Sequence, residues 1–204
     1  MSEKVFAPSV ARNSRPILAV LREEFAHLES ILEIGSGTGQ HAVCFAAELD
    51  HLTWQCSDVA ANHADINAWL SEAMLPNVRA PVILDTLTAK LPTASYDGVY
   101  SANTAHIMSL EAVAKMFALV GSALRDAGSF VLYGPFRHNG TFNSASNAEF
   151  HHSLRRRDSA MGIRHLEVLD DYGNAADLER ARLYAMPANN HIAVWIRNNR
   201  RRAK

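Results

Sequence analysis

The residues with the clearest chemical potential form a glycine-rich stretch, ILEIGSGTGQHA, at residues 31–42. Apolar residues run into Gly35, Gly37 and Gly39, and a helix-compatible run follows. This pattern predicts a strand, a tight turn and the N-terminus of a helix. Glycines let the backbone approach a ligand without a Cβ in the way, and the free N–H groups of a helix N-terminus attract negative groups. The stretch therefore predicts a loop that holds a nucleotide-like cofactor.

Three further polar side chains follow other predicted strands: Asp58, Asp85 and Asn103. In a mostly parallel sheet they lie with the glycines beyond the carboxyl ends of the strands, where ligands bind. A carboxylate at position 58 can accept both hydroxyls of a ribose, and Asp85 can accept from an adenine amine. Asp also caps helices and makes turns, so each carboxylate has a structural alternative.

Two cofactors are compatible with these residues. Gly37, Gly39 and Ala42 satisfy the G-x-G-x-x-G/A fingerprint, and Asp58 lies about 20 residues on, as in a nicotinamide-dependent oxidoreductase. Glu33, two residues before the first glycine, favours a different ligand. Its carboxylate would repel a pyrophosphate but suits the ammonium and sulfonium groups of S-adenosylmethionine. We expect Glu33 to order the loop or to meet that ammonium.

Alternating strand and helix patterns must position these groups. Ser14 is expected to cap a first helix, with Pro16 in its first turn. The alternation predicts a three-layer αβα, Rossmann-like fold with a mostly parallel sheet. We predict strands at 31–34, 52–57, 81–84, 96–101 and 129–133; helices at 40–49, 65–74, 110–124 and 148–157; a loop at 136–147; a helix end at 177–180; and a closing antiparallel hairpin at 181–186 and 191–197.

The composition is that of a folded protein with a sizeable core. The 204 residues, 48% of them hydrophobic, suit one domain over 1–204, with a helical cap at 1–29 and a solvated basic tail at 198–204. The net charge of −1 gives no indication of a nucleic-acid or membrane partner. Two isolated cysteines and ten scattered histidines predict no metal site. Without a signal peptide or an apolar run near ~20 residues, we expect a cytoplasmic protein.

The chain resembles the class I S-adenosylmethionine-dependent methyltransferases and, within them, the DUF938 or UPF0585 family. The glycine loop is common to the whole class, whereas the other stretches are more particular to the family. The resemblance covers nearly the whole chain and is carried by "ARNSRPIL" (11–18), "LEIGSGTGQHA" (32–42), "WQCSDV" (54–59), "SANTAHI" (101–107), "LYGPF" (132–136), "SNAEF" (146–150), "LRRRDSAMGIR" (154–164) and "MPANN" (186–190).

The resemblance implies a seven-stranded mixed sheet with the last strand antiparallel, and S-adenosylmethionine as cofactor. It does not imply a substrate; we predict methyl transfer to a small-molecule or peptide acceptor. The stretch Ser101–Thr104 is not Asn/Asp-Pro-Pro-Tyr/Phe, which argues against enzymes that methylate exocyclic amines of nucleic acid bases. An NAD(P)-dependent oxidoreductase and a non-catalytic cofactor-binding or scaffold protein are the alternatives.

The candidate site residues fall into three groups. Asn103 and His106 follow the fourth strand as catalytic candidates, His106 as a general base or a structural histidine. Arg12 suits a carboxylate of the cofactor or of an acidic substrate, or a surface ion pair. The candidates for cofactor binding are Arg12, Asn13, Glu33, Gly35, Ser36, Gly37, Gly39, Gln40, Asp58, Asp85 and Asn103; those for the acceptor are Tyr133, Arg137, Asn189 and Asn190.

One segment departs from the pattern of the family. His151 and His165 stand where Asp is expected, Ser159 where Pro is expected and Met161 where Trp is expected. If this segment lines the acceptor pocket, the charge and shape of that pocket differ from those of relatives.

Overall fold

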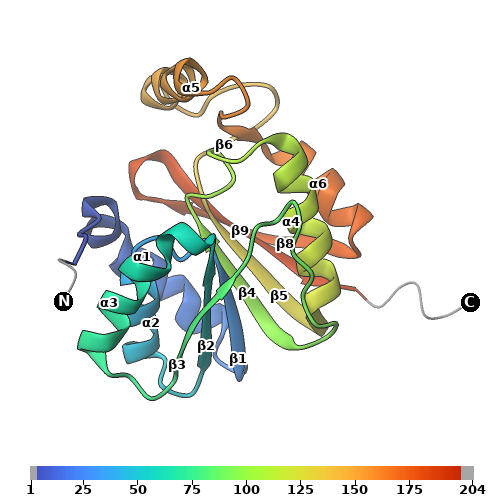
Figure 1. Ribbon diagram of the computed structural model, residues 1–204. Helices are drawn as coiled ribbons and strands as arrows, with labels where there is room; N and C mark the ends of the chain where they lie inside the picture. The colour runs from blue at the N-terminus through green and yellow to red at the C-terminus, as the bar shows by residue number, and fades with distance from the viewer. Residues whose placement is uncertain (1–3, 199–204) are drawn as a thin grey trace, which may run out of the picture.

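The strands of the protein form one large sheet, seen near its centre in Figure 1. The computed structural model describes residues 4–198, and within them this sheet has seven strands in the order β3-β2-β1-β4-β5-β9-β8. Their bounds are β1 (Ser30–Ile34), β2 (Thr53–Asp58), β3 (Val78–Ile83), β4 (Tyr96–Ala102), β5 (Leu124–Gly134), β8 (Leu178–Met186) and β9 (Asn190–Arg197).

The pairing of the strands confirms the predicted mixed sheet. Strands β3, β2, β1, β4 and β5 pair in parallel, whereas β9 runs antiparallel to both of its neighbours, β5 and β8. The chain adds β2 and β3 on one side of β1 and then returns to place β4 on the other side. The strand order therefore reverses between β1 and β4, the position where open sheets of this kind bind ligands.

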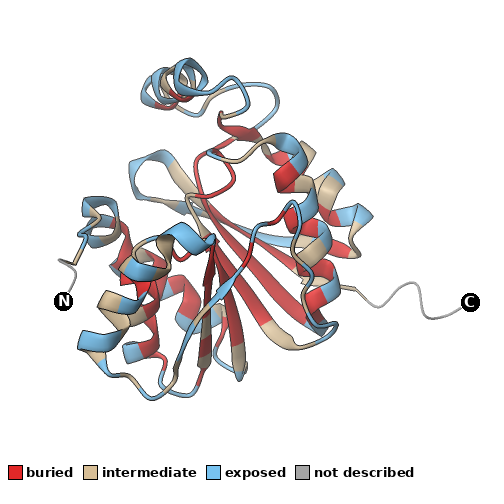
Figure 2. Ribbon diagram, viewed as in Figure 1, coloured by how far each residue is buried: buried red, intermediate tan, exposed pale blue. Residues whose placement is uncertain are grey.

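Helices cover both faces of the sheet and bury two apolar cores (Figures 1 and 2). On one face, α1 (Pro8–Glu24), α2 (Gln40–Glu48) and α3 (His63–Ala73) pack over a core that includes Phe45 and Trp54. On the other face, α4 (Leu110–Ala123) and α6 (Leu166–Ala175) pack around Phe117 and Trp195. None of the helices within residues 4–198 has the length and apolar character needed to cross a membrane.

The segment between β5 and α6 stands apart from these layers. It contains the short strands β6 (Phe136–Arg137) and β7 (Arg164–His165), which pair in parallel, and helix α5 (Ala145–Arg157). In Figure 1, α5 lies above the carboxyl ends of the central strands. The predicted loop at 136–147 thus includes a short strand and the first turn of α5.

The first helix begins earlier than predicted. Pro8 occupies its first turn, where a missing N–H costs nothing, and Ser14 lies inside the helix instead of capping it. The Ser14 hydroxyl donates to the Val10 carbonyl 2.6 Å away, so this cap-forming side chain is satisfied within the helix. Arg12 and Asn13, predicted to precede the helix, are therefore held rigidly on it.

Two other element predictions were wrong. Residues 177–180 do not end a helix, because α6 stops at Ala175 and β8 already starts at Leu178. Pro81, expected to open the third strand, lies inside β3. That strand is at the edge of the sheet, where a residue without an N–H is tolerated.

Candidate functional site

The glycine loop connects β1 to α2 at the reversal of strand order. The amides of Gly35 and Ser36 both donate to the Ser57 carbonyl, at 3.0 and 2.9 Å, which fastens the loop to the end of β2. Gly35 has φ +75°, and a Cβ built on it would lie 2.6 Å from Cγ2 of Thr104, after β4. Only glycine therefore lets the two loops approach each other so closely.

Glu33 supports the loop from beneath and does not line the cavities described below. Its side chain is buried, and its Oε2 accepts from the Ser36 hydroxyl at 2.9 Å and from the Trp54 indole at 3.1 Å. Burial raises the pKa of Glu33 to about 7, and the nearby Asp58 adds to that increase. These hydrogen bonds order the loop, and a contact of Glu33 with the ammonium of the cofactor stays a prediction.

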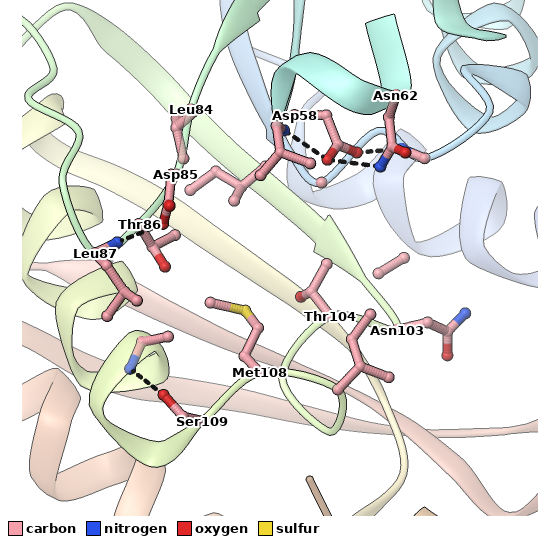
Figure 3. Close-up of a pocket in the computed structure, with 17 residues that line it drawn as sticks. Asp58, Asn62, Leu84, Asp85, Thr86, Leu87, Asn103, Thr104, Met108 and Ser109 are labelled. Carbon is pink, nitrogen blue, oxygen red and sulfur yellow. Dashed lines mark hydrogen bonds between the residues drawn. The ribbon is translucent and has the colours of Figure 1, made fainter. Parts of the chain in front are cut away.

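A cavity of about 490 Å³ opens between the glycine loop and the ends of β2, β3 and β4 (Figure 3). This volume lies within the ~300–1,000 Å³ range of pockets for small ligands. Figure 3 shows Asp58 and Asp85 on one side of it and Met108 and Ser109 on the opposite side. We call it the larger cavity; it is lined by Ile34, Gly35, Gly37, Asp58, Val59, Asn62, Leu84, Asp85, Thr86, Leu87, Ala102, Asn103, Thr104, Ile107, Met108, Ser109 and Ala112.

Asp58 is the last residue of β2 and is fixed by three donors. Its Oδ2 accepts from the Gly37 amide at 2.7 Å, while its Oδ1 accepts from the Val59 amide at 2.7 Å and from the Asn62 side chain at 2.9 Å. A carboxylate offers about four lone-pair sites. As arranged, Asp58 therefore has room for one further hydroxyl, fewer than the two ribose hydroxyls expected from the sequence.

Asp85 follows β3 and combines the two roles considered for it. Its Oδ1 accepts from the Leu87 amide at 2.9 Å, the hydrogen bond of a local turn. The residue is nevertheless exposed and lines the larger cavity. Its Oδ2 has no hydrogen-bond partner among the described residues and can accept from a ligand amine.

Asn103 connects the larger cavity to a second one. It follows β4 with φ +59°, a conformation that Asn adopts more readily than most residues, and its amide donates to the Tyr133 carbonyl at 2.9 Å. It lines both the larger cavity and a cavity of about 330 Å³ between α1 and the β8–β9 hairpin. We call this second space the smaller cavity; its walls are Ser9, Arg12, Asn13, Pro16, Asn103, Tyr133, Pro187, Ala188 and Asn190.

His106, the candidate base, lines neither cavity. Its ring is buried and packs edge-on against Phe150 of α5, with ring centroids 5.3 Å apart. Burial lowers the pKa of His106 to about 4, and the cation of Arg164 acts in the same direction. The structure therefore presents a neutral, packed histidine at this position.

Arg164 organises the loop that follows β4. Its Nε donates to the Ala105 carbonyl at 2.8 Å, and its Nη2 donates to the carbonyls of Met108 and Ala160, the latter at 2.8 Å. The side chain is buried, and its hydrogen bonds to Ala105 and Met108 fix the segment that carries Met108 into the larger cavity.

Two acceptor candidates lie outside both cavities. Arg137, on β6, places its guanidinium 4.2 Å from the ring centroid of Phe142 and donates to the Gly140 carbonyl. Asn189 uses its carbonyl to accept from Asn143 and Asn147, which ties the β8–β9 hairpin to α5.

The segment that departs from the family pattern also lies outside the two cavities. His151, on α5, accepts from the Ile163 amide at 3.1 Å, and its ring packs on Gly162, where a Cβ would meet it at 2.9 Å. His165 precedes α6. None of His151, Ser159, Met161 and His165 is among the residues that line either cavity.

The structure sorts the predicted site residues by position. Gly35, Gly37, Asp58, Asp85 and Asn103 line the larger cavity. Arg12 and Asn13, predicted for the cofactor, join Tyr133 and Asn190, predicted for the acceptor, in the smaller cavity. The remaining loop candidates, Glu33, Ser36, Gly39 and Gln40, hold the loop in place: the Gln40 side chain, for example, accepts from the Ala7 amide ahead of α1.

No group of three or more His, Cys, Asp or Glu side chains within residues 4–198 is arranged to hold a metal ion. The basic tail falls almost entirely at 199–204, outside the described residues.

Residues 4–197 match the family model described as "Protein of unknown function (DUF938)". The chain belongs to the DUF938 family. Solved structures place the fold of this DUF938 protein among methyltransferases. An O-methyltransferase family protein from Burkholderia thailandensis superposes with a TM-score of 0.79 at 13% identity, over 93% of this chain and 57% of that one. At this identity the likeness shows the fold.

Two further similar structures were solved with a ligand. PigF with SAH gives a TM-score of 0.78 at 16% identity, over 91% of this chain and 56% of PigF. Human N-acetylserotonin methyltransferase in complex with SAM gives 0.79 at 11% identity, over 94% of this chain and 53% of the human protein. The DUF938 protein thus spans a little more than half the length of these methyltransferases.

Several residues of the site were missed by sequence reasoning. Asn62 fixes Asp58, Thr104 packs on the glycine loop, and Met108 and Ser109 form the wall opposite the two carboxylates. Arg164 carried no signal of its own, because its role depends on carbonyls more than 50 residues earlier in the chain. Asn62 alone had a usable signal, since it lies one helical turn after Asp58.

Proposed function

We propose that this DUF938 protein is an S-adenosylmethionine-dependent methyltransferase with a small-molecule or peptide acceptor. The charge of the larger cavity carries the proposal. Asp58 and Asp85 are its ionisable residues, and none of the described residues that line it is Lys, Arg or His. A pyrophosphate would meet two negative charges there, whereas a ligand with sulfonium and ammonium groups would be attracted.

The shape of the loop fits the same cofactor. A Cβ built on Gly37, which lines the larger cavity, meets nothing within 4 Å, so the backbone there borders open space that a ligand can occupy. Asp58 would accept from a ribose hydroxyl, and Asp85 from an adenine amine. Two proteins of the same fold, PigF and the human N-acetylserotonin methyltransferase, were solved with SAH and SAM, which supports this assignment.

The residues around Asn103 suit catalysis by positioning. When bound, S-adenosylmethionine supplies an electrophilic methyl group, whose transfer to an acceptor N, O or S leaves the neutral thioether on the donor sulfur and releases an acceptor proton. Asn103 borders both cavities, so its amide can orient an acceptor at the junction. Holding two reactants in line can supply most of the rate acceleration, which agrees with the position of His106 outside both cavities.

Calorimetric titration tests the cofactor assignment. SAM, SAH and NADH are titrated into the wild-type protein, into Asp58→Asn and into Asp50→Asn, a matched control at an exposed position away from both cavities. We expect SAH to bind the wild type and the control equally. Asp58→Asn should bind at least about tenfold more weakly, the size expected for one hydrogen bond to a charged group.

Thermal unfolding of each variant separates lost binding from lost folding. If NADH raises the melting temperature of the wild type and SAH does not, the oxidoreductase alternative replaces our proposal. If SAH binds but no methyl group is transferred to any acceptor in a cell extract supplied with labelled S-adenosylmethionine, the cofactor-binding scaffold is favoured instead.

A further inference from the structure

The smaller cavity differs from the larger one in charge. Among its lining residues, all of them described, Arg12 is the single ionisable group that is charged at neutral pH, and no carboxylate is present. The larger cavity, across Asn103, has two carboxylates and no cation. Two adjoining spaces with opposite charge are suited to different ligands, or to different parts of one ligand.

Arg12 has no internal partner to neutralise it. Its side chain lies on α1, is exposed, and makes no ion pair or hydrogen bond with the described residues. Two other arginines that lie on α1 or bind to it are paired: Arg22 with Glu48 at 2.5 Å, and Arg182 with Glu24 of α1 at 2.5 Å. A guanidinium fork left free beside a cavity suits a carboxylate.

Tyr133 supplies a second donor to the same space. Burial raises the pKa of Tyr133, so its hydroxyl keeps its proton at neutral pH and can donate. The side chains of Asn13 and Asn190 lie beside that hydroxyl, and all three residues line the smaller cavity.

Neighbouring hydrogen bonds fix both asparagines. The Asn13 Oδ1 lies 2.8 Å from Nε2 of the buried His41 and can only accept, so His41 carries its proton on Nε2. The Asn190 side chain donates to the Pro187 and Ala188 carbonyls and holds the turn of the hairpin. Hydrogen bonds within the protein therefore hold both asparagine side chains before any ligand enters.

We propose that the smaller cavity is the acceptor site and that it takes a small carboxylic acid, whose carboxylate binds Arg12 and Tyr133. The inference rests on the proposed function, because it assigns the larger cavity to the cofactor and leaves the adjoining space for the acceptor. At about 330 Å³ the cavity is near the lower end of ligand pockets, which favours a small molecule over a peptide. Asn103 then stands where the acceptor meets the donor.

A competing source of the carboxylate is the methionine tail of the cofactor. Arg12 borders the smaller cavity and is not among the residues lining the larger one. We therefore assign Arg12 to the acceptor, and the experiment measures the affinity for cofactor and for acid separately.

The experiment uses matched pairs of probes. The acids 4-hydroxybenzoate, mandelate, indole-3-acetate and N-acetylglycine, each beside its primary amide, are titrated calorimetrically into the SAH-saturated protein. The variants are Arg12→Gln, Tyr133→Phe and Arg15→Gln. The last removes the same charge from the same helix at an exposed position outside both cavities.

We expect at least one acid to bind the wild type at least about tenfold more tightly than its amide. Arg12→Gln should abolish that preference, Tyr133→Phe should reduce it several-fold, and Arg15→Gln should retain it. The affinity of Arg12→Gln for SAH should stay within about twofold of the wild-type value.

Three outcomes overturn the inference. The first is that no acid binds better than its amide. The second is that Arg15→Gln loses the preference as fully as Arg12→Gln, which would indicate a general effect of charge. The third is that Arg12→Gln weakens SAH binding about tenfold, which would assign Arg12 to the cofactor. If SAH fails to bind the wild type, it is the proposed function that fails, and the same acids titrated into the free protein then test the carboxylate site alone.

Discussion

Glu33→Gln should make the stability of the protein less dependent on pH. Both hydrogen bonds to the Glu33 carboxyl, from Ser36 and from Trp54, arrive at the same oxygen, Oε2. The carbonyl oxygen of a glutamine can take that place and accept both. The substitution therefore removes the titration of a buried group while it keeps the shape and the hydrogen bonds of the side chain.

The sign of the effect follows from which state, folded or unfolded, binds the proton of Glu33 more tightly. The pKa of Glu33 in the folded protein is about 7, above its ordinary value of 4.5. Between these two values the folded state binds more protons than the unfolded state, so the free energy of unfolding falls as the pH rises. The contribution is fully present below pH 4.5 and is lost above pH 7. At about 1.4 kcal/mol per pKa unit, the loss is of order 3 kcal/mol.

Urea denaturation of the wild type and of Glu33→Gln at intervals from pH 5 to 8.5 measures this directly. The variant should match the wild type near pH 5 and exceed it by roughly 3 kcal/mol at pH 8, or about 6–12 °C in melting temperature. His41 and His106, whose pKa values are lowered to about 4 by burial, make unfolding more costly as the pH rises from 4 to 6.5. Because both proteins contain these histidines, the difference between the two curves isolates Glu33.

Glu29→Gln at an exposed position serves as the control and should give a difference that does not change with pH. A difference between Glu33→Gln and the wild type that stays constant from pH 5 to 8.5 would refute the reasoning, because it would show that Glu33 does not titrate in this range.

Four further substitutions test the packing around the site. Gly35→Ala should destabilise the protein by about 2–4 kcal/mol, because positive φ and the 2.6 Å approach to Thr104 both oppose a Cβ. Gly37→Ala also has positive φ but faces open space, so it should cost only about 1 kcal/mol. Equal losses of stability for the two variants in urea denaturation would contradict this account. Arg164→Met should cost about 3 kcal/mol, because it leaves buried carbonyls without donors. Arg164→Lys should recover part of that loss, because it restores a donor. A single hydrogen bond typically contributes ~1 kcal/mol, so a cost of less than about 0.5 kcal/mol for Arg164→Met in the same assay would argue against the role assigned to Arg164.

Most of the fold could be predicted because the strands are short apolar runs that end in recognisable turn residues. The errors arose where a local signal was overruled by the surroundings. Ser14 resembled a helix cap, yet Pro8 provides the actual first turn and the Ser14 hydroxyl bonds within the helix. Pro81 was expected to open the third strand, yet it lies inside β3, because an edge strand tolerates a residue without an N–H. Sequence does not show which strand is at the edge until the order is known.

The site could be predicted where the function of a residue depends on its own chain neighbours. The glycine loop and Asp58 are of this kind, since a strand end and a turn fix their positions. Glu33 was correctly placed on the strand before the glycine loop, but the direction of its side chain could not be predicted, because it depends on Trp54 in the next strand. His106 looked available for catalysis until α5, more than 40 residues later, covered it with Phe150.

The residues that line the two cavities come from very different lengths of the chain. Every residue that lines the larger cavity lies between 34 and 112, whereas the smaller cavity needs residues from 9 to 190. A growing chain would thus have all the wall residues for the first ligand before the hairpin at 187–190 that encloses the second is made. If the proposed assignment holds, the same separation lets changes in that hairpin during evolution alter which acceptor is bound, while every residue that lines the larger cavity stays as it is.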